Sequence, residues 1–151
     1  MRILDKIAES NRIEGIHREP TGEEMAQYLD FMQLEYVEIR HLEKFVSIYQ
    51  PNAVLRTQVG YNVRVGNHEP PRGGPHIAEQ LKALLNEANA IQGSNEAWNI
   101  HLQYENLHPF TDGNGRSGRM LWYWMMGHQS GLGFLHTFYY QTLNNMQRHS
   151  I

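Results

Sequence analysis

The chain contains no cysteine, and this absence excludes several classes of site at once. Without thiols it can form no disulfide, bind no zinc through thiolates and use no cysteine nucleophile. A chain of 151 residues fits a single domain and can bury a sizeable core. We therefore expect one domain over 1–151 that folds without a disulfide or a structural metal.

Long apolar runs and an excess of charge of one sign are also missing. No stretch approaches the roughly 20 apolar residues of a transmembrane helix, and the opening MRILDKIAES lacks the uninterrupted apolar segment of a signal peptide. The formal net charge of −3 gives no general attraction to nucleic acid or to anionic lipid. We expect a cytoplasmic protein without nucleic-acid or membrane partners, in which any positively charged site is local.

What the chain does contain is mostly helical patterning, and apolar spacing predicts helices over about 3–14, 25–42 (as one helix or two joined ones), 77–90, 96–107 and from 115 onward. Thr21 followed by Glu24 has the spacing of a capping box at a helix start. Residues 56–66, RTQVGYNVRVG, have a different period, because apolar or aromatic residues alternate with polar ones as in a β-strand. Gly60 marks a hairpin turn in this segment. The sequence therefore predicts a mainly α protein with one short β element.

The stretch 108–119, HPFTDGNGRSGR, places two arginines where the backbone is already positive. Gly113 and Gly115 predict a loop that leads into a helix, so that Arg116 and Arg119 fall in the first helical turn. Unpaired N–H groups and the helix dipole disfavour cations there. The arrangement therefore indicates a bound anion.

The residues of this stretch suit a phosphate site with a proton acceptor beside it. The glycine turn and the Asn114 side chain can donate hydrogen bonds to an anion, and each arginine can fork onto phosphate oxygens. Asp112 offers a carboxylate oxygen of the kind that Mg²⁺ prefers. His108, placed before Pro109, can accept a proton when neutral, a form that the two arginines should favour. On the residues alone, a glycine loop with solvated arginines is an equal alternative, and no Walker-type GxxxxGK[ST] sequence is present.

HPFTDGNGRSGR matches the signature HxFx(D/E)GNGRxxR without departure, and on this motif the chain resembles the Fic (Fic/Doc) family. Residues 56–71, RTQVGYNVRVGNHEPP, resemble the family's flap hairpin, and residues 10–21, SNRIEGIHREPT, resemble its N-terminal inhibitory motif (S/T)xxxE(G/N). The resemblance implies a Fic-type helical bundle with an inhibitory helix over about 1–15 and a short β-hairpin flap beside the active-site loop of 108–119.

The resemblance also implies a reaction, the transfer of AMP from ATP to a Ser, Thr or Tyr hydroxyl with release of pyrophosphate. His108 would be the general base, and Asp112 would hold Mg²⁺ on the α- and β-phosphates. Arg116 and Arg119 would bind the β- and γ-phosphates. The 56–66 flap would hold a target protein by adding its segment as a strand.

Two further groups of residues carry expected roles in nucleotide binding. Gly113, Asn114 and Gly115 would line the anion hole that takes the charge developing on the transferred phosphoryl group. Tyr139 and Tyr140 lie where family members place an aromatic side chain near the adenine, and helix packing is the alternative role for these tyrosines.

Glu14 and Ser10 supply regulation in this interpretation. Glu14 stands before Gly15 at a helix end, where the dipole disfavours a carboxylate. In the family this glutamate pairs with the second motif arginine, here Arg119, and blocks the productive position of the γ-phosphate. Ser10, four residues earlier, would help to fix the helix against the loop. We therefore expect an autoinhibited protein AMP transferase.

Other interpretations stay open beside this one. Glu14 could instead orient a water that removes AMP from a modified protein. The domain could also be a non-catalytic nucleotide-binding interaction module that Glu14 keeps closed, although intact His108 and Asp112 favour an enzyme. Transfer of other groups from other donors is a further possibility. The chain itself is a second candidate target, and a homo-oligomer is compatible with the sequence.

Overall fold

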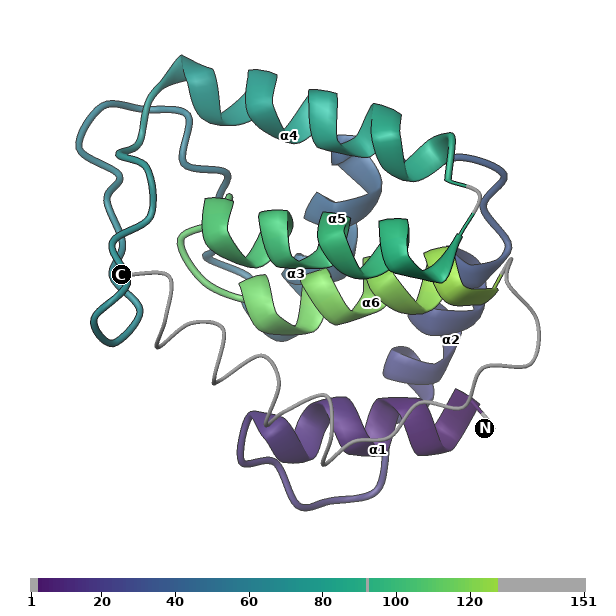
Figure 1. The fold of residues 1–151 in the computed structure, drawn as a ribbon. Helices are drawn as coiled ribbons and strands as arrows, with labels where there is room; N and C mark the ends of the chain where they lie inside the picture. The colour runs from purple at the N-terminus through teal and green to yellow at the C-terminus, as the bar shows by residue number, and fades with distance from the viewer. Residues whose placement is uncertain (1–2, 92, 128–151) are drawn as a thin grey trace.

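The computed structural model describes residues 3–91 and 93–127, which form six α-helices, α1 (Ile3–Ile13), α2 (Gly22–Met32), α3 (Ile39–Tyr49), α4 (Pro75–Asn89), α5 (Ser94–Leu107) and α6 (Asn114–Gly127). The predicted mainly helical class is confirmed. Figure 1 shows α4, α5 and α6 stacked in this order, with α1 on the side of the molecule away from α4. None of the helices described is both long and apolar enough to cross a bilayer.

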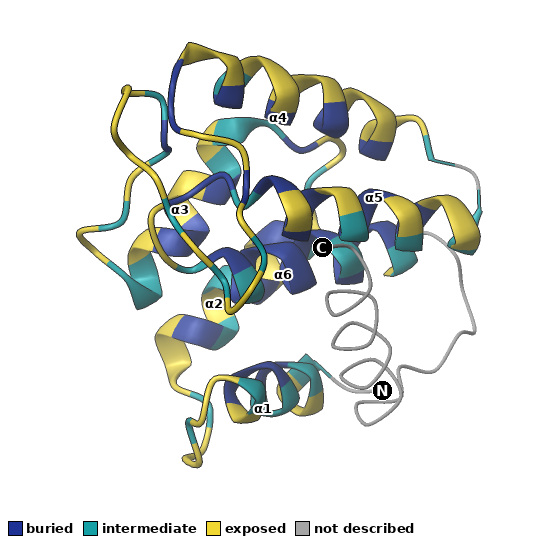
Figure 2. Cartoon of the chain, turned by 60° about the vertical axis from the view of Figure 1, so that its left-hand side comes forward, coloured by how far each residue is buried: buried dark blue, intermediate teal, exposed yellow. Residues whose placement is uncertain are grey.

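Helix α6 occupies the middle of the bundle. It packs against α5, α2, α3 and α1, and most of its side chains are buried. The other helices turn apolar faces inward and leave polar faces exposed, as α4 and α5 show clearly (Figure 2). Because α6 starts at the end of the glycine-rich loop, residues 108–119 are directly connected to the helix at the centre of the core.

The start of α2 agrees with the sequence prediction. The Thr21 hydroxyl accepts from Glu24 N at 3.1 Å, and Thr21 N donates to Glu24 Oε1 at 2.9 Å, which completes the capping box. The segment predicted as one helix or two is two helices. The chain breaks between them because the Asn89 side chain accepts from Val37 N at 2.8 Å and donates to Val37 O at 3.0 Å. These bonds replace the helical bonds of Val37.

Residues 56–66 differ from the predicted hairpin. The part of the chain that the structure describes contains no strand, and this segment is an irregular loop on the way from α3 to α4. Its surroundings contain two isolated β-bridges, one between Leu55 and Phe110 and one between Val65 and His68.

The physical reason for this difference lies in Arg56, which the alternating pattern placed on a polar face. Its side chain is fully buried, and its guanidinium donates to the carbonyl oxygens of Tyr61 and Pro71. The loop therefore curls around a buried cation, with Gly60 in the left-handed region at φ 98°. A period of two fits an extended ribbon, but residues 3–91 and 93–127 contain no second strand to pair with it.

Candidate active site

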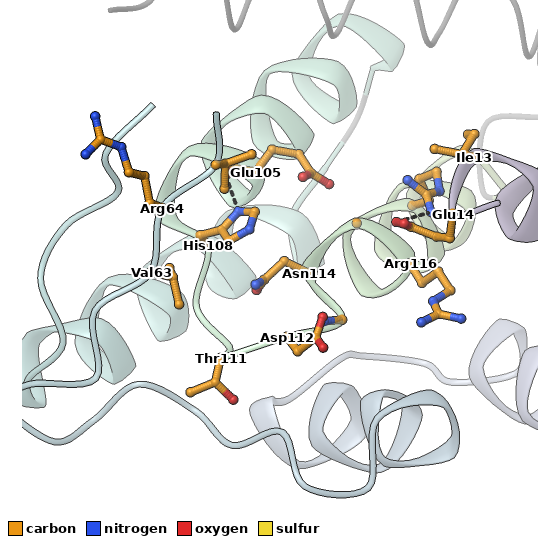
Figure 3. A pocket seen from close by; sticks show the side chains of 14 residues that line it. Ile13, Glu14, Val63, Arg64, Glu105, His108, Thr111, Asp112, Asn114 and Arg116 are labelled. Carbon is orange, nitrogen blue, oxygen red and sulfur yellow. Dashed lines mark hydrogen bonds and ion pairs between the residues drawn. The ribbon is translucent and has the colours of Figure 1, made fainter. Parts of the chain in front are cut away.

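A cavity of about 510 Å³ lies between the end of α1, the loop that joins α5 to α6, and residues 63–65 (Figure 3). Its volume falls in the range of roughly 300–1,000 Å³ that is typical of small-ligand sites. The structure brings Glu14 and all the predicted site residues of the 108–119 motif together in its lining, which consists of Ile13, Glu14, Val63, Arg64, Val65, Glu105, His108, Thr111, Asp112, Gly113, Asn114, Gly115, Arg116 and Arg119.

His108 follows the last residue of α5 and has left-handed backbone angles, φ 50° and ψ 63°. No other non-glycine residue among those described has a positive φ. Its Nδ1 lies 3.0 Å from the carbonyl oxygen of Glu105. Because a carbonyl can only accept, Nδ1 must carry the ring proton. The neutral ring therefore keeps Nε2 free of a proton, as a general base requires.

Burial lowers the pKa of His108, and the positive charge of Arg56 and the neighbouring His68 act in the same direction. The hydrogen bond to Glu105 and the charge of Asp112 oppose the shift without reversing it. The neutral form is thus favoured, but the cause differs from the prediction. Burial and Arg56, rather than the two motif arginines, keep the proton off the ring.

Asn114 braces the glycine turn. Its Oδ1 accepts from Phe110 N, and its Nδ2 donates to Phe110 O, both at 2.8 Å. The side chain is therefore engaged within the loop, and donation to an anion through its second N–H stays a prediction. Gly113 has φ 80°, and a Cβ there would lie 3.1 Å from Val46 Cγ1. The first turn of α6 lines the cavity, and the unpaired N–H groups of a helix start can bind an anion.

Asp112 lies exposed at the edge of the cavity. Its Oδ1 accepts from Gly113 N at 2.8 Å, which leaves the other carboxylate oxygen available as a ligand. Residues 3–91 and 93–127 contain no group of three or more acidic or histidine side chains that could hold a metal ion. A Mg²⁺ bound by Asp112 would need further ligands from phosphates and water, which is the usual coordination at nucleotide sites.

Arg116 is a buried cation, with only 8 % of its surface exposed. Its guanidinium lies over the ring of Tyr49, 4.2 Å from the centroid. Its Nε has no hydrogen-bond partner among the residues that the structure describes. A buried polar atom without a partner is costly, and the side chain that carries it lines the cavity, where it could bind an anion.

Arg119, by contrast, is held by the end of α1. Its Nε donates to Ser10 Oγ at 2.8 Å, and its Nη2 lies 3.2 Å from Ser10 O and 3.3 Å from Glu14 Oε1. The Glu14 carboxylate also rests against the start of α6, because a Cβ on Gly115 would lie 2.7 Å from Glu14 Oε1. The end of α1 and the start of α6 each carry a charge that the helix dipole disfavours, and here the carboxylate of Glu14 pairs with the guanidinium of Arg119.

Sequence reasoning missed Glu105, which also lines the cavity. It is buried, and its Oε1 lacks a hydrogen-bond partner within the described part of the chain. Burial raises the pKa of Glu105 to about 8, while the nearby charges of Arg119 and Glu14 act in opposite directions. Its neighbour His101, at 3.9 Å, has a pKa that burial lowers to about 3, so burial favours the neutral form of both side chains. The spacing of four and three that joins His101, Glu105 and His108 on one helical face was the available signal.

The predicted contacts to adenine, Tyr139 and Tyr140, lie outside the residues that the structure describes. Tyr49, which supports Arg116, and Arg56, which approaches His108, were also missed, and no spacing in the sequence indicated either of them.

Comparison with known families gives one match. The model described as "Fic/DOC family" matches residues 31–126. The matched range includes the 56–66 loop and the whole of 108–119, and it begins after α1, so that it does not extend to Ser10 or Glu14. The search of curated proteins found no match.

Proposed function

Because the chain belongs to the Fic/DOC family, we propose that it is an autoinhibited protein AMP transferase. It moves AMP from ATP to a Ser, Thr or Tyr hydroxyl of a target protein or of the chain itself. Family membership supports nucleotide transfer to proteins in general. The observation that carries the specific reaction is a shared cavity, which is lined by His108, with a proton-free Nε2, and by Arg116, whose Nε lacks a partner among the described residues.

In the proposed reaction His108 accepts the proton of the target hydroxyl through Nε2. The hydroxyl oxygen forms a bond to the α-phosphorus, and the bond from phosphorus to the pyrophosphate oxygen breaks. The first N–H groups of α6 face the developing charge, and such fixed donors stabilise a transition state without reorganisation. Arg116 binds the leaving pyrophosphate, and this anion pairs with the buried guanidinium, whose Nε otherwise has no partner among the described residues.

Asp112 would hold a Mg²⁺ ion, which supplies neutralisation of phosphate charge when bound. The fit rests on the exposed carboxylate at the cavity edge, of which one oxygen is already fixed by Gly113 N. That hydrogen bond orients the carboxylate before any ion arrives.

Glu14 is the proposed inhibitory residue. Its carboxylate pairs with Arg119 and lies against the start of α6, where the γ-phosphate would have to bind. A phosphate bound there would lie close to the Glu14 carboxylate, and the two negative charges would repel each other. Productive ATP binding therefore requires Glu14 to move away. Removal of the carboxylate should therefore activate the protein.

Residues 56–66 are the proposed docking segment for the target. Val63, Arg64 and Val65 line the cavity beside His108, and Val59 is 87 % exposed. A target strand that pairs with this loop would bring its hydroxyl to Nε2 of the base.

The test is incubation with α-labelled ATP and Mg²⁺, followed by detection of label on the chain or on proteins of a lysate. We expect label with Glu14→Gly, little with the unchanged chain, and none with Glu14→Gly combined with His108→Ala. Mass spectrometry of labelled proteins then identifies the modified residue. If the Glu14→Gly protein binds ATP but labels nothing, the chain is a nucleotide-binding module and the proposal is wrong.

AMP removal is a second candidate, and one observation favours it. The Glu14 carboxylate lines the same cavity as His108, where it could orient a water. Protein labelled by the Glu14→Gly variant is the substrate for this test. Release of AMP by the unchanged chain but not by Glu14→Gly would assign removal as the main reaction.

A further inference from the structure

Arg56 plays no part in the proposed chemistry, yet it is among the largest side chains that the fold encloses completely, with 0 % exposed surface. A buried guanidinium usually pairs with a carboxylate. Here, among the residues that the structure describes, the groups that accept from Arg56 are all backbone carbonyls. Burial lowers the pKa of this side chain, but a guanidinium stays protonated in proteins.

Two of these carbonyls belong to the end of α5. Nε donates to His108 O at 2.6 Å, and Nη2 donates to Leu107 O at 2.8 Å. The last carbonyls of a helix lack partners within the helix and carry the negative end of its dipole. Arg56 therefore caps α5 with a full positive charge, and it does so at the carbonyl of the proposed base.

The other two carbonyls belong to the loop that reaches the cavity. Nη1 donates to Tyr61 O at 3.1 Å and to Pro71 O at 2.7 Å. The backbone of Arg56 also binds the turn that follows α5, because its N–H donates to Pro109 O at 2.9 Å. One side chain thus joins the end of α5 to the loop whose residues 63–65 face His108 across the cavity.

The backbone of His108 needs such support. A residue other than glycine is strained in the left-handed region and persists there only where the surrounding structure imposes it. The N–H of His108 is held by Tyr104 O at 3.0 Å, and its carbonyl is held by Arg56. Without the bond from Arg56 to its carbonyl, His108 could leave the left-handed conformation, and the imidazole would then move from its present position.

We propose that Arg56 is a positioning residue, which holds Nε2 of His108 in a fixed place relative to the loop on which the target hydroxyl would lie. The inference rests on the proposed function of His108 as the base. Its physical core, the control of the His108 ring by a distant guanidinium, can be measured without any assay of transfer.

The test compares Arg56→Met, which removes the charge, with Arg56→Lys, which keeps the charge but cannot reach four carbonyls. Arg40→Met is the control, because Arg40 is an exposed arginine of α3 whose partner is the exposed Glu38. Long-range ¹H–¹⁵N spectra of the imidazoles report the tautomer and the pKa of each ring. Comparison with the spectrum of His108→Asn assigns His108 among the nine histidines of the chain.

We expect His108 to be protonated on Nδ1 in the unchanged chain and in Arg40→Met, and to be a mixture of tautomers in both Arg56 variants. Its pKa should rise in Arg56→Met, which loses a nearby positive charge, and rise less in Arg56→Lys. In a Glu14→Gly background, kcat for AMP transfer should fall by about 100-fold in Arg56→Met, the size typical of a ~1 Å misplacement. The affinity for ATP should stay within about twofold, because Arg56 does not line the cavity.

An unchanged tautomer and pKa of His108 in a folded Arg56 variant would refute the inference. If Arg56→Met does not fold, the lysine variant decides. The two proposals fail separately. If the tautomer and pKa of His108 change in the Arg56 variants but the Glu14→Gly parent transfers no AMP, the proposed function is refuted. If the tautomer and pKa stay unchanged and the parent is active, only the role of Arg56 is refuted.

Discussion

His108 combines an unusual backbone conformation with a defined proton position, and the two have one origin. The left-handed turn at the end of α5 brings Nδ1 within 3.0 Å of Glu105 O, and this contact leaves Nε2 as the acceptor. The residue is also partly buried, and this desolvation lowers the pKa of His108, so that protonation is disfavoured. A base prepared in this way should work at and below neutral pH.

The pH dependence of transfer tests this point. In Glu14→Gly, kcat/KM should be constant around neutral pH and fall on the acid side, because a protonated ring cannot accept a proton. The midpoint should lie below 6.5, since the pKa of His108 is lowered from that value. Initial rates measured from pH 5 to 8 give the midpoint. A midpoint above 6.5 would contradict the favoured neutral form.

Glu105 offers a second test, of stability rather than of activity. Its folded pKa of about 8 lies above the usual 4.5, so the folded state holds the proton more tightly than the unfolded state. The resulting stabilisation is complete below about pH 4.5 and is lost as pH rises through 8. A glutamine at this position cannot ionise, so the Glu105→Gln variant should not lose stability in this way as pH rises.

Thermal unfolding at a series of pH values should show the melting temperature of the unchanged chain falling relative to that of Glu105→Gln between pH 4.5 and 8, with a constant difference above. The charged or titratable groups that face Glu105 are His101, Arg119 and Glu14, and all three are present in both proteins. Parallel curves for the two proteins would show that Glu105 is ionised in the fold.

The difference between predicted and missed residues follows from their distance along the chain. His108, Asp112, Arg116 and Arg119 share one turn and the helix start that follows it, so local spacing alone places them in one cavity. Arg56 reaches its carbonyl acceptors through tertiary folding, and its alternating neighbours indicated an exposed position instead.

At the scale of elements, α5 and α6 pack closely because Gly118 has no side chain. A Cβ there would collide with Glu105 Oε1 and would lie 3.0 Å from Tyr104 Cδ1. The Tyr104 ring cannot give way easily, because its hydroxyl is hydrogen-bonded to Ser117 Oγ at 2.7 Å. The helix pair therefore depends on a glycine that helix propensity alone would replace by alanine.

Gly118→Ala should lower the free energy of unfolding by about 1–3 kcal/mol, the usual cost of overpacking a core, despite the better helix propensity of alanine. Gly22→Ala is the matched control, since a Cβ at this first residue of α2 meets nothing within 4 Å. Urea unfolding of both variants gives the comparison. Equal stability of Gly118→Ala and the unchanged chain would mean that α5 and α6 can separate at little cost.

The bounds of α1, α4 and α5 lie within two residues of the prediction, but α3 continues to Tyr49, beyond the predicted end at 42, and the connections between helices were not predicted. The capping box of Thr21 and Glu24 is a local device, and the structure confirms it. The break between α2 and α3 depends on Asn89, far along the chain, which binds the backbone of Val37. The same holds for the 56–66 loop, which is shaped by a buried cation rather than by its own period.

At the scale of the whole molecule, the candidate site and the core share one helix. The first turn of α6 faces the cavity, and the rest of α6 packs against α1, α2, α3 and α5. Arg119 connects the two functions, because it belongs to the motif and also holds the end of α1 through Ser10 and Glu14. A ligand that binds at the start of α6 should therefore stabilise the whole fold.

This coupling predicts a difference in thermal stability between two forms of the chain. At an ATP concentration of about 100 times Kd, binding to the folded state contributes ~2.7 kcal/mol, which for a chain of this size raises the melting temperature by roughly 5–10 °C. Glu14→Gly should show this rise with ATP and Mg²⁺. The unchanged chain should show much less at the same concentration, because Glu14 competes with phosphate for Arg119.

Glu14→Gly combined with Arg116→Met is the control for this shift. It keeps an apolar side chain against Tyr49 and removes the cation that lacks a partner at Nε within the described residues. The shift should largely disappear in this double variant. Equal shifts in the unchanged chain and in Glu14→Gly would mean that the carboxylate does not restrain the site. A shift in neither would mean that ATP does not bind at the start of α6.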